Sequence, residues 1–346
     1  MDATNTGKLT NFKNTGGGQI YGFDALKFFM ALMIVAIHTK AFHDVDIIRQ
    51  ITQPFLNSAV PIFFILSSYF LFRKMDSKGY SWTIYWPFLK RLFILYAFWF
   101  IATLPLTVYE KWSYIDYGFP YILWYVIKDF LFSYTFAGSW FLTALIVGTL
   151  IVFILKKCLK ATSLILLILA LLTFLYVKLV ALCPLWLQKP YLFIQTNIRE
   201  VVELTPVTGF IWCCVGCVLA SSDAMKIISS RFGKRNIMVV FIITYIASVF
   251  LPNNTAFVVL PFLVLSIILL AYIIRLEPRG LYMKLRNLSI LIYLLHFRLL
   301  YLRIIMPANC LHILYYVAVV FSSLLIAELI LKLEKVNSFS FLKYSH

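Results

Sequence analysis

Charged residues are scarce in this chain of 346 residues: 13% are Asp, Glu, Lys or Arg, whereas 62% are hydrophobic. A soluble domain averages about a quarter charged and about half apolar residues, so a soluble fold is excluded. The alternation of polar and apolar residues that transmembrane strands require is absent as well. Helices satisfy every backbone N–H and C=O within one segment of a bilayer. The sequence therefore predicts an all-α, polytopic integral membrane protein.

The sequence also lacks the patterns of a metal site, of a cleavable signal peptide and of a phosphate-binding loop. Among the six cysteines, only Cys214 and Cys217 form a C-x-x-C pattern, and they lie in the apolar run 211–220 without a second pair or a nearby His. We expect packing residues there, no metal site and no permanently bound cofactor. The first 22 residues are polar and contain no apolar signal region, and the glycines at 16–18 lack the context of a phosphate loop. They predict a flexible cytoplasmic leader over 1–22.

Ten apolar runs of a length suited to a hydrocarbon layer of about 30 Å follow the leader. We place them at 23–42, 55–73, 87–109, 138–156, 162–183, 204–221, 236–251, 255–275, 286–306 and 311–333. A further segment at 119–134 is rich in aromatic residues but contains Lys128 and Asp129, which predicts an interfacial or re-entrant helix. The runs predict a transmembrane domain over 23–333 and a short cytoplasmic tail over 334–346.

The formal net charge of +17 arises from short clusters of Lys and Arg between the apolar runs, not from one basic stripe. A nucleic-acid partner is therefore rejected in favour of the lipid bilayer. With the N-terminus inside, most of these residues fall on the cytoplasmic side; the outer loops hold Arg49, Lys111, Lys128, Lys189 and Arg199. The positive-inside rule then predicts both termini in the cytoplasm and a multi-pass location in the cell (inner or plasma) membrane.

Ionisable residues inside the first run are the strongest candidates for function, because such residues are costly in a membrane. Lys27 and His38 are eleven positions apart, which places both on one helix face, about 16 Å apart along the axis. Asp24 lies one turn before Lys27 and can pair with it. This pattern suits an anionic ligand at the inner end and proton transfer farther along. The alternatives are that Lys27 extends to the headgroups and that His38 is a structural or water-boundary residue.

Weaker candidates occur in other runs. Ser67 and Tyr69 interrupt the second run, and Trp140 opens the fourth. Small hydroxyl residues are common at helix contacts, and a Trp at a helix start can be an interface anchor. In the ninth run Ser289, Tyr293 and His296 occupy positions i, i+4 and i+7, which is one face of a helix.

Four stretches resemble acyltransferase family 3, whose membrane proteins O-acylate sugars and related envelope molecules. They are FDALK followed by His38, FFILSSYFL in the second run, the Trp-Phe-Leu that begins at Trp140, and the Ser-x-x-x-Tyr-x-x-His that ends at His296. The resemblance extends from residue 21 to about 306. Lys27 replaces the family's usual arginine and so lacks its bidentate fork, and Ser68 replaces a usual glycine.

The resemblance implies a transmembrane acyltransferase domain that transfers an acyl group, commonly acetyl, from cytoplasmic acyl-coenzyme A to a hydroxyl of a glycan or lipid-linked sugar. It implies that His38 is the general base. Lys27, Asp24, Lys90 and Arg91 on the inner side would bind the donor; the alternative for Lys90 and Arg91 is that they are routine positive-inside residues. The acceptor or passage would be lined by Ser67, Tyr69, Trp140, Ser289, Tyr293 and His296. The competing hypotheses are a transporter or exporter without chemistry and a structural partner of a glycan synthase. The identity of the acceptor and of the acyl group, an acyl-enzyme and a homodimer all stay open.

Overall fold

The structure is a computed structural model. It describes residues 19–112, 118–120, 123–124, 127, 139–197, 201–221, 224–252, 255–274, 276–277, 279–307 and 310–346. Within these ranges every regular element is a helix, which confirms the all-α prediction. Residues 1–18 of the predicted leader and most of the predicted interfacial segment at 119–134 lie outside the described residues.

Each predicted span coincides with a helix, and α7 was not predicted. The α-helices are α1 Tyr21–Thr39, α2 Asp46–Lys78, α3 Trp82–Trp112, α5 Ser139–Lys157, α6 Ser163–Leu179, α7 Leu185–Asn197, α8 Pro206–Ala220, α9 Ala224–Phe250, α10 Leu260–Ile273, α11 Gly280–Leu299, α12 Leu302–Ile305 and α13 His312–Leu333. Short 3₁₀ helices cover Val180–Leu182, Val202–Leu204, Ala256–Val258 and, in the predicted tail, Asn337–Ser345 (η6).

In the described part of the chain, 8 helices are long and apolar enough to cross a membrane. The helices at the other two predicted spans each differ from these 8 helices in one property. Helix α8 is apolar but has only 15 residues, and α11 is 20 residues long but carries three basic residues, Lys284, Arg286 and Arg298. A multi-pass membrane protein is thus supported by the structure, whereas the number of ten spans and the orientation stay predictions.

Helix α2 is much longer than its predicted span. It has 33 residues, and its first turns, with Ile47 69% exposed, project beyond the bundle. An apolar run marks the part of a helix that suits hydrocarbon, whereas backbone hydrogen bonding continues through polar ends. Helix α9 also starts before its predicted span and is interrupted at Gly233, whose φ of 66° an L side chain rarely adopts.

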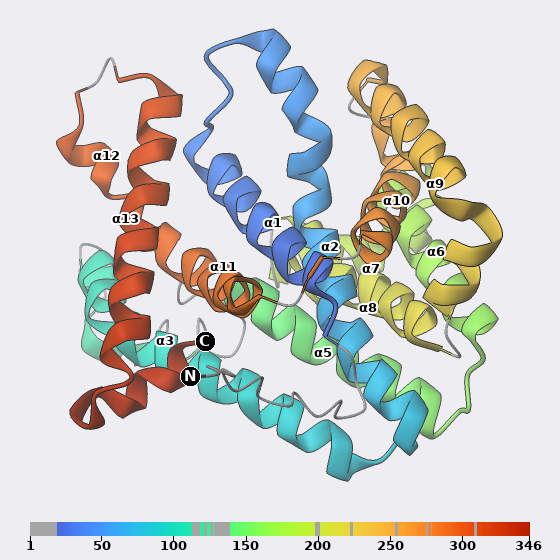
Figure 1. Cartoon of the computed structure of the whole chain (residues 1–346), viewed down its shortest axis with the longest axis horizontal. Helices are drawn as coiled ribbons and strands as arrows, with labels where there is room; N and C mark the ends of the chain where they lie inside the picture. Colours follow the sequence, from blue (N-terminus) through green and yellow to red (C-terminus); the bar gives the residue numbers. More distant parts are fainter. Residues whose placement is uncertain are drawn as a thin grey trace, which may run out of the picture.

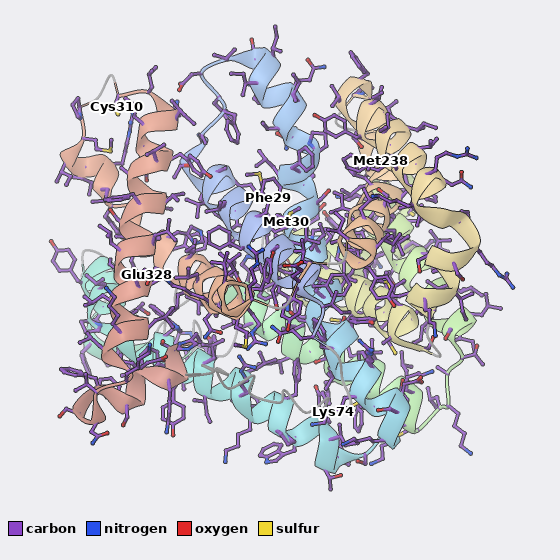
Figure 2. The ribbon with its side chains drawn as sticks, viewed as in Figure 1. Phe29, Met30, Lys74, Met238, Cys310 and Glu328 are labelled. Atoms are coloured by element: carbon purple, nitrogen blue, oxygen red, sulfur yellow. The ribbon has the colours of Figure 1, made fainter. Side chains whose placement is uncertain are left out.

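Helix α1 lies in the middle of the bundle, in contact with α2, α10, α11 and α13 (Figure 1). Helices α5 and α8 pack against each other and against α2, while α3 passes along one edge and contacts η6. Lys74, near the end of α2, and Cys310, before α13, lie near opposite ends of the molecule (Figure 2). Their placement on opposite sides of the membrane stays a prediction.

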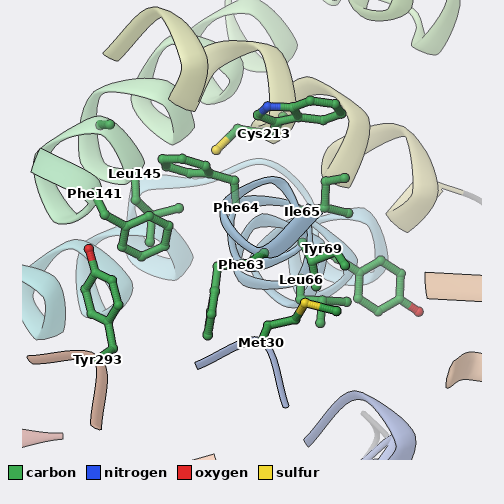
Figure 3. Packing of buried hydrophobic residues seen from close by; sticks show 14 of the residues in the cluster. Met30, Phe63, Phe64, Ile65, Leu66, Tyr69, Phe141, Leu145, Cys213 and Tyr293 are labelled. Atoms are coloured by element: carbon green, nitrogen blue, oxygen red, sulfur yellow. The ribbon is translucent and has the colours of Figure 1, made fainter. Parts of the chain in front are cut away.

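The core surrounds the middle of α2 (Figure 3). Phe64 is fully buried there and its ring centroid is 4.5 Å from that of Phe141 on α5. Met30 of α1 and Cys213 of α8 complete this cluster, and all three cysteines of α8 are buried. The predicted packing role of the cysteines is therefore confirmed.

Two close helix crossings hold α8 in place. A Cβ added at Gly209 would overlap the backbone of Ala144 on α5, and one added at Gly216 would overlap Ser68 and Ile65 on α2. Ser68 is buried and donates a hydrogen bond to the carbonyl oxygen of Phe64 (2.8 Å). The serine that replaces the family's glycine therefore fits because its neighbour across the crossing is Gly216. Small residues allow such close approach between membrane helices.

We expect Gly209→Leu to destabilise the protein, because α5 and α8 must separate to admit the side chain. Overpacking of this kind costs about 1–3 kcal/mol or more. Thermal unfolding of the detergent-solubilised protein measures the effect, with a midpoint several degrees below wild type. Gly280→Leu is the matched control, since nothing lies within 4 Å of its Cβ position. Equal midpoints for Gly209→Leu and wild type would contradict the close crossing.

Candidate functional site

Helices α1 and α11 run side by side in the same direction. Near their starts the rings of Tyr21 and Tyr282 are 5.5 Å apart, and near their ends the rings of His38 and His296 are 5.3 Å apart. Parallel helices require an odd number of membrane crossings between them, and seven predicted spans separate these two. The pair therefore carries one group of candidate residues at each end.

At the end predicted to be outer, His38 meets His296. His38 is exposed, whereas His296 is 0% exposed. The ring of Phe297 is 4.4 Å from His38 and 4.2 Å from His296, measured between centroids, so it packs against both imidazoles. The structure thus joins two histidines that the sequence analysis had assigned to different roles. Of the two, His38 alone is exposed on the bundle.

The surroundings of His296 indicate which of its two ring nitrogens carries the proton. Nδ1 lies 3.2 Å from the carbonyl oxygen of Ile292, one turn earlier in α11. A carbonyl oxygen only accepts, so Nδ1 carries the proton and donates. Nε2 is then a lone-pair acceptor, and it is buried without a hydrogen-bond partner. An unpartnered buried acceptor is rare in native structures and points to a functional partner.

At the inner end, Lys27 lies among other charges. Its ammonium group is 5.0 Å from the ring centroid of Phe70, and the charges of Asp24, Arg286 and Arg91 act on it. Asp24 is buried and accepts a hydrogen bond from Gln19 (2.7 Å). The predicted pairing of Asp24 with Lys27 is therefore a longer-range electrostatic interaction and not a direct contact.

Three cations thus converge from three helices: Lys27 from α1, Arg91 from α3 and Arg286 from α11. Arg91 and Arg286 are exposed, as is Lys90 beside them, whose donor-binding role stays a prediction. Side chains of this kind provide a site for phosphate groups. We call Lys27, Arg91 and Arg286 the inner cation cluster.

The chain's last residues border this cluster. The indole N–H of Trp99 on α3 donates to the backbone carbonyl of Ser345 (2.9 Å), and both residues are buried. His346 Nε2 lies 3.3 Å from a carboxylate oxygen of Glu334. These contacts fix η6 against α3. Glu328 of α13 (labelled in Figure 2) forms a salt bridge with Lys284 of α11, which holds this neighbouring helix pair together.

The residues predicted to line a passage do not lie together. Tyr69 contacts Phe23 (5.7 Å between centroids) and Arg73, so it belongs to the inner half near Lys27. Ser67 is half-buried on α2, and Trp140 is buried against Phe64 (6.1 Å). Their lining role stays a prediction.

Two of the predicted residues on α11 contribute to the core. Ser289 is fully buried and donates to the carbonyl oxygen of Arg286 (2.7 Å). The ring centroid of Tyr293 is 5.5 Å from that of Phe141 (Figure 3). Its distance from the ring centroid of His296 is 5.9 Å. Of the α11 motif, His296 and Tyr293 therefore lie at the His38 end.

A polar contact fixes the chain directly after His38. Asp44, in the connection between α1 and α2, accepts hydrogen bonds from the backbone N–H of His312 (2.8 Å) and from its ring Nδ1 (2.6 Å) at the start of α13. These bonds hold the pKa of Asp44 below its ordinary value of 3.8. The contact joins the end of α1 to α13.

A lowered carboxyl pKa contributes stability above the unfolded-state pKa, and this contribution is lost as the pH falls through the folded-state pKa. We expect Asp44→Asn to lower the thermal midpoint at pH 7 and pH 5, and the difference from wild type to shrink toward pH 3. Asp46→Asn is the control, because Asp46 pairs with Arg49 through a side chain that is 85% exposed. A difference that persists unchanged at pH 3 would contradict the role of the carboxylate.

Two residues of the candidate site, Arg286 and Phe297, were not predicted from the sequence. Arg286 was one of many basic residues in the inner loops, and Phe297 was one of many aromatic residues. No local pattern distinguishes either of them. Their positions beside Lys27 and His38 depend on the alignment of α11 with α1.

Comparison with known proteins identifies the family. A family model of an acyltransferase domain matches residues 20–332. Two proteins of Enterococcus faecalis, both named amino-acid racemase, are 31% and 29% identical over 141 residues. The alignments cover 39% of this chain but 18% and 19% of those proteins, so the chain matches less than a fifth of their length. No solved structure matches it. Because the family model spans all the helices that carry both ends of the site, the chain belongs to acyltransferase family 3.

Proposed function

We propose that this protein is a membrane acyltransferase that moves an acyl group, acetyl in the simplest case, from acyl-coenzyme A to a hydroxyl of a glycan or lipid-linked sugar. One observation carries the proposal. The parallel pair α1 and α11 bears the inner cation cluster at one end and an accessible histidine at the other. Eleven residues of helix separate Lys27 from His38, which is about 16 Å.

This separation suits the shape of the donor. Coenzyme A carries its phosphates at one end and its thioester at the end of an extended pantetheine arm. Lys27, Arg91 and Arg286 would bind the phosphates by charge-assisted hydrogen bonds. The arm would then follow α1, so that the thioester reaches His38. The ring of Phe70 beside Lys27 supplies an apolar contact at the start of this route.

His38 would act as general base and then as general acid. Its neutral imidazole removes the proton of the acceptor hydroxyl while the oxygen attacks the thioester carbonyl carbon. The tetrahedral intermediate then releases the coenzyme A thiolate, which takes the proton from the imidazolium. The products are the acyl ester and the free thiol, and His38 returns to its starting form. Imidazole suits this role because its ordinary pKa is near 6.5.

The exposure of His38 suggests the side of the bundle from which the acceptor approaches. His38 is exposed at the end of the bundle predicted to face outward, so an envelope acceptor would approach from there, at the inner or plasma membrane. Ser67, Trp140 and Tyr293 are candidates for holding it or for lining its path. The acceptor would be recognised mainly through polar groups near this end.

Membranes that contain the protein, incubated with radiolabelled acetyl-coenzyme A and a bacterial envelope glycan fraction, test the proposal. Label that enters the glycan only when the protein is present, with release of free thiol in equal amount, is the expected result. Absence of label and of thiol release from well-expressed protein would contradict it. Passage of labelled glycan across proteoliposomes without acylation would favour the transporter hypothesis instead.

A further inference from the structure

Four neighbours enclose the imidazole of His296. Phe297 and Tyr293 pack against it from α11 itself, the carbonyl oxygen of Ile292 accepts the proton of Nδ1, and His38 closes the side toward α1. The side chain is 0% exposed. An acceptor substrate therefore cannot touch His296 in this arrangement, whereas His38 is exposed. Any part that His296 plays in the chemistry must act through His38.

The unpartnered Nε2 is the second observation. With Nδ1 donating to Ile292, Nε2 offers a lone pair and no proton. A residue needed only for packing would not keep such an atom buried, because a buried acceptor without a donor destabilises the fold. The two histidine ring centroids are 5.3 Å apart. Nε2 of His296 has no hydrogen-bond partner in this arrangement, so a bond between the two imidazoles requires the ring of His38 to turn toward it.

We infer that His296 is a positioning residue for His38: its Nε2 accepts a hydrogen bond from the ring N–H of His38 when the site is engaged. The bond fixes the tautomer of His38. One of its nitrogens then carries the proton and faces His296, and the other presents its lone pair to the acceptor hydroxyl. When His38 takes the substrate proton, the same bond stabilises the imidazolium. Second partners that orient a catalytic imidazole act in this way in other enzymes.

The inference rests on the proposed function, in which His38 is the base. Three variants separate positioning from packing. In His296→Gln the amide oxygen can occupy the position of Nε2 and accept the hydrogen bond. In His296→Asn the shorter side chain reaches only the position of Nδ1, so no acceptor replaces Nε2. His296→Phe keeps the ring but has no polar atom. We expect Gln to retain kcat within about 10-fold and Asn and Phe to lose about 100-fold. The KM for acyl-coenzyme A stays unchanged, because the inner cation cluster lies at the other end of the helix pair.

A readout that does not need turnover completes the experiment. Nitrogen-15 spectra of histidine-labelled protein report which ring nitrogen of His38 carries the proton; its signals are assigned by their loss in His38→Gln. With coenzyme A bound, we expect one tautomer in wild type and in His296→Gln, and a mixture in His296→Asn. Thermal midpoints measure how well each variant is folded.

The outcomes are distinct. Equal loss of kcat in all three variants, in step with lost stability, would show a structural role and overturn the inference, as would full activity in His296→Phe. A mixture of tautomers in wild type with coenzyme A bound would overturn it too. A single His38 tautomer that depends on His296, in a protein that transfers no acyl group, would keep the positioning contact while the proposed function fails.

Discussion

Replacing His38 with alanine is expected to lower acyl transfer by at least about 100-fold per folded molecule, the range in which a general base contributes. The substitution removes the accessible member of the histidine pair and leaves the hydroxyl proton without an acceptor. His296 cannot take over, because it is fully buried. The measurement is the initial rate of label transfer from acetyl-coenzyme A to the glycan fraction, normalised to folded protein in the membrane.

His43→Ala is the matched control for this loss. His43 is an exposed histidine that follows His38 by five positions, and its ring faces His312 at 6.5 Å rather than His296. Its replacement should leave the rate within about twofold, as for other exposed positions away from the chemistry. Comparable rates in His38→Ala and wild type would remove His38 from the mechanism. Comparable losses in His38→Ala and His43→Ala would indicate a general effect on this end of the bundle.

Charge reversal in the inner cation cluster is expected to raise the KM for the donor by at least about 10-fold and to leave kcat nearly unchanged. Arg286→Glu places a carboxylate beside Lys27 and Arg91, where the proposal puts the donor phosphates. In the proposed arrangement the reacting carbonyl is at the other end of α1, so the substitution is expected to weaken ground-state and transition-state binding alike. Steady-state rates over a series of acetyl-coenzyme A concentrations at fixed ionic strength measure both constants.

Two controls distinguish phosphate binding by Arg286 from a general effect of surface charge. Lys234→Glu changes charge equally on an exposed residue of α9 at the predicted cytoplasmic side, and it should leave the KM unchanged. Acetyl-pantetheine carries the thioester without the phosphates, so its KM should be the same for Arg286→Glu and wild type. A KM for acetyl-pantetheine that rises in step with that for acetyl-coenzyme A would place Arg286 elsewhere than at the phosphates. An equal effect of Lys234→Glu would indicate only the overall surface charge.

Much of this architecture follows from local properties of the chain. The scarcity of charge and the length of the apolar runs predicted helices at all ten positions, because hydropathy along one segment determines whether it can enter hydrocarbon. The first and last residues of the helices were less predictable. Helix α2 extends past its run at both ends, because backbone hydrogen bonding does not stop where the apolar residues stop. Helix α7 was missed because its 13 residues include Gln, Lys and Asn and form no long apolar run. Lys27, His38 and His296 stood out singly because ionisable residues are rare within such runs.

The sequence by itself determined that this chain is helical and membrane-embedded, and it identified the residues whose burial must have a reason. Only the tertiary structure decided which of them meet. His38 and His296 are 258 positions apart, and no periodicity within either helix specifies that α11 lies beside α1 in parallel register. That arrangement depends on close approaches between distant helices, such as Gly22 against Ala271 of α10 and Gly209 against α5, which are properties of surface shape. The same alignment brings Arg286 to Lys27, whereas the packing of α2 against Phe23 of α1 places Tyr69 at the inner end, away from His38.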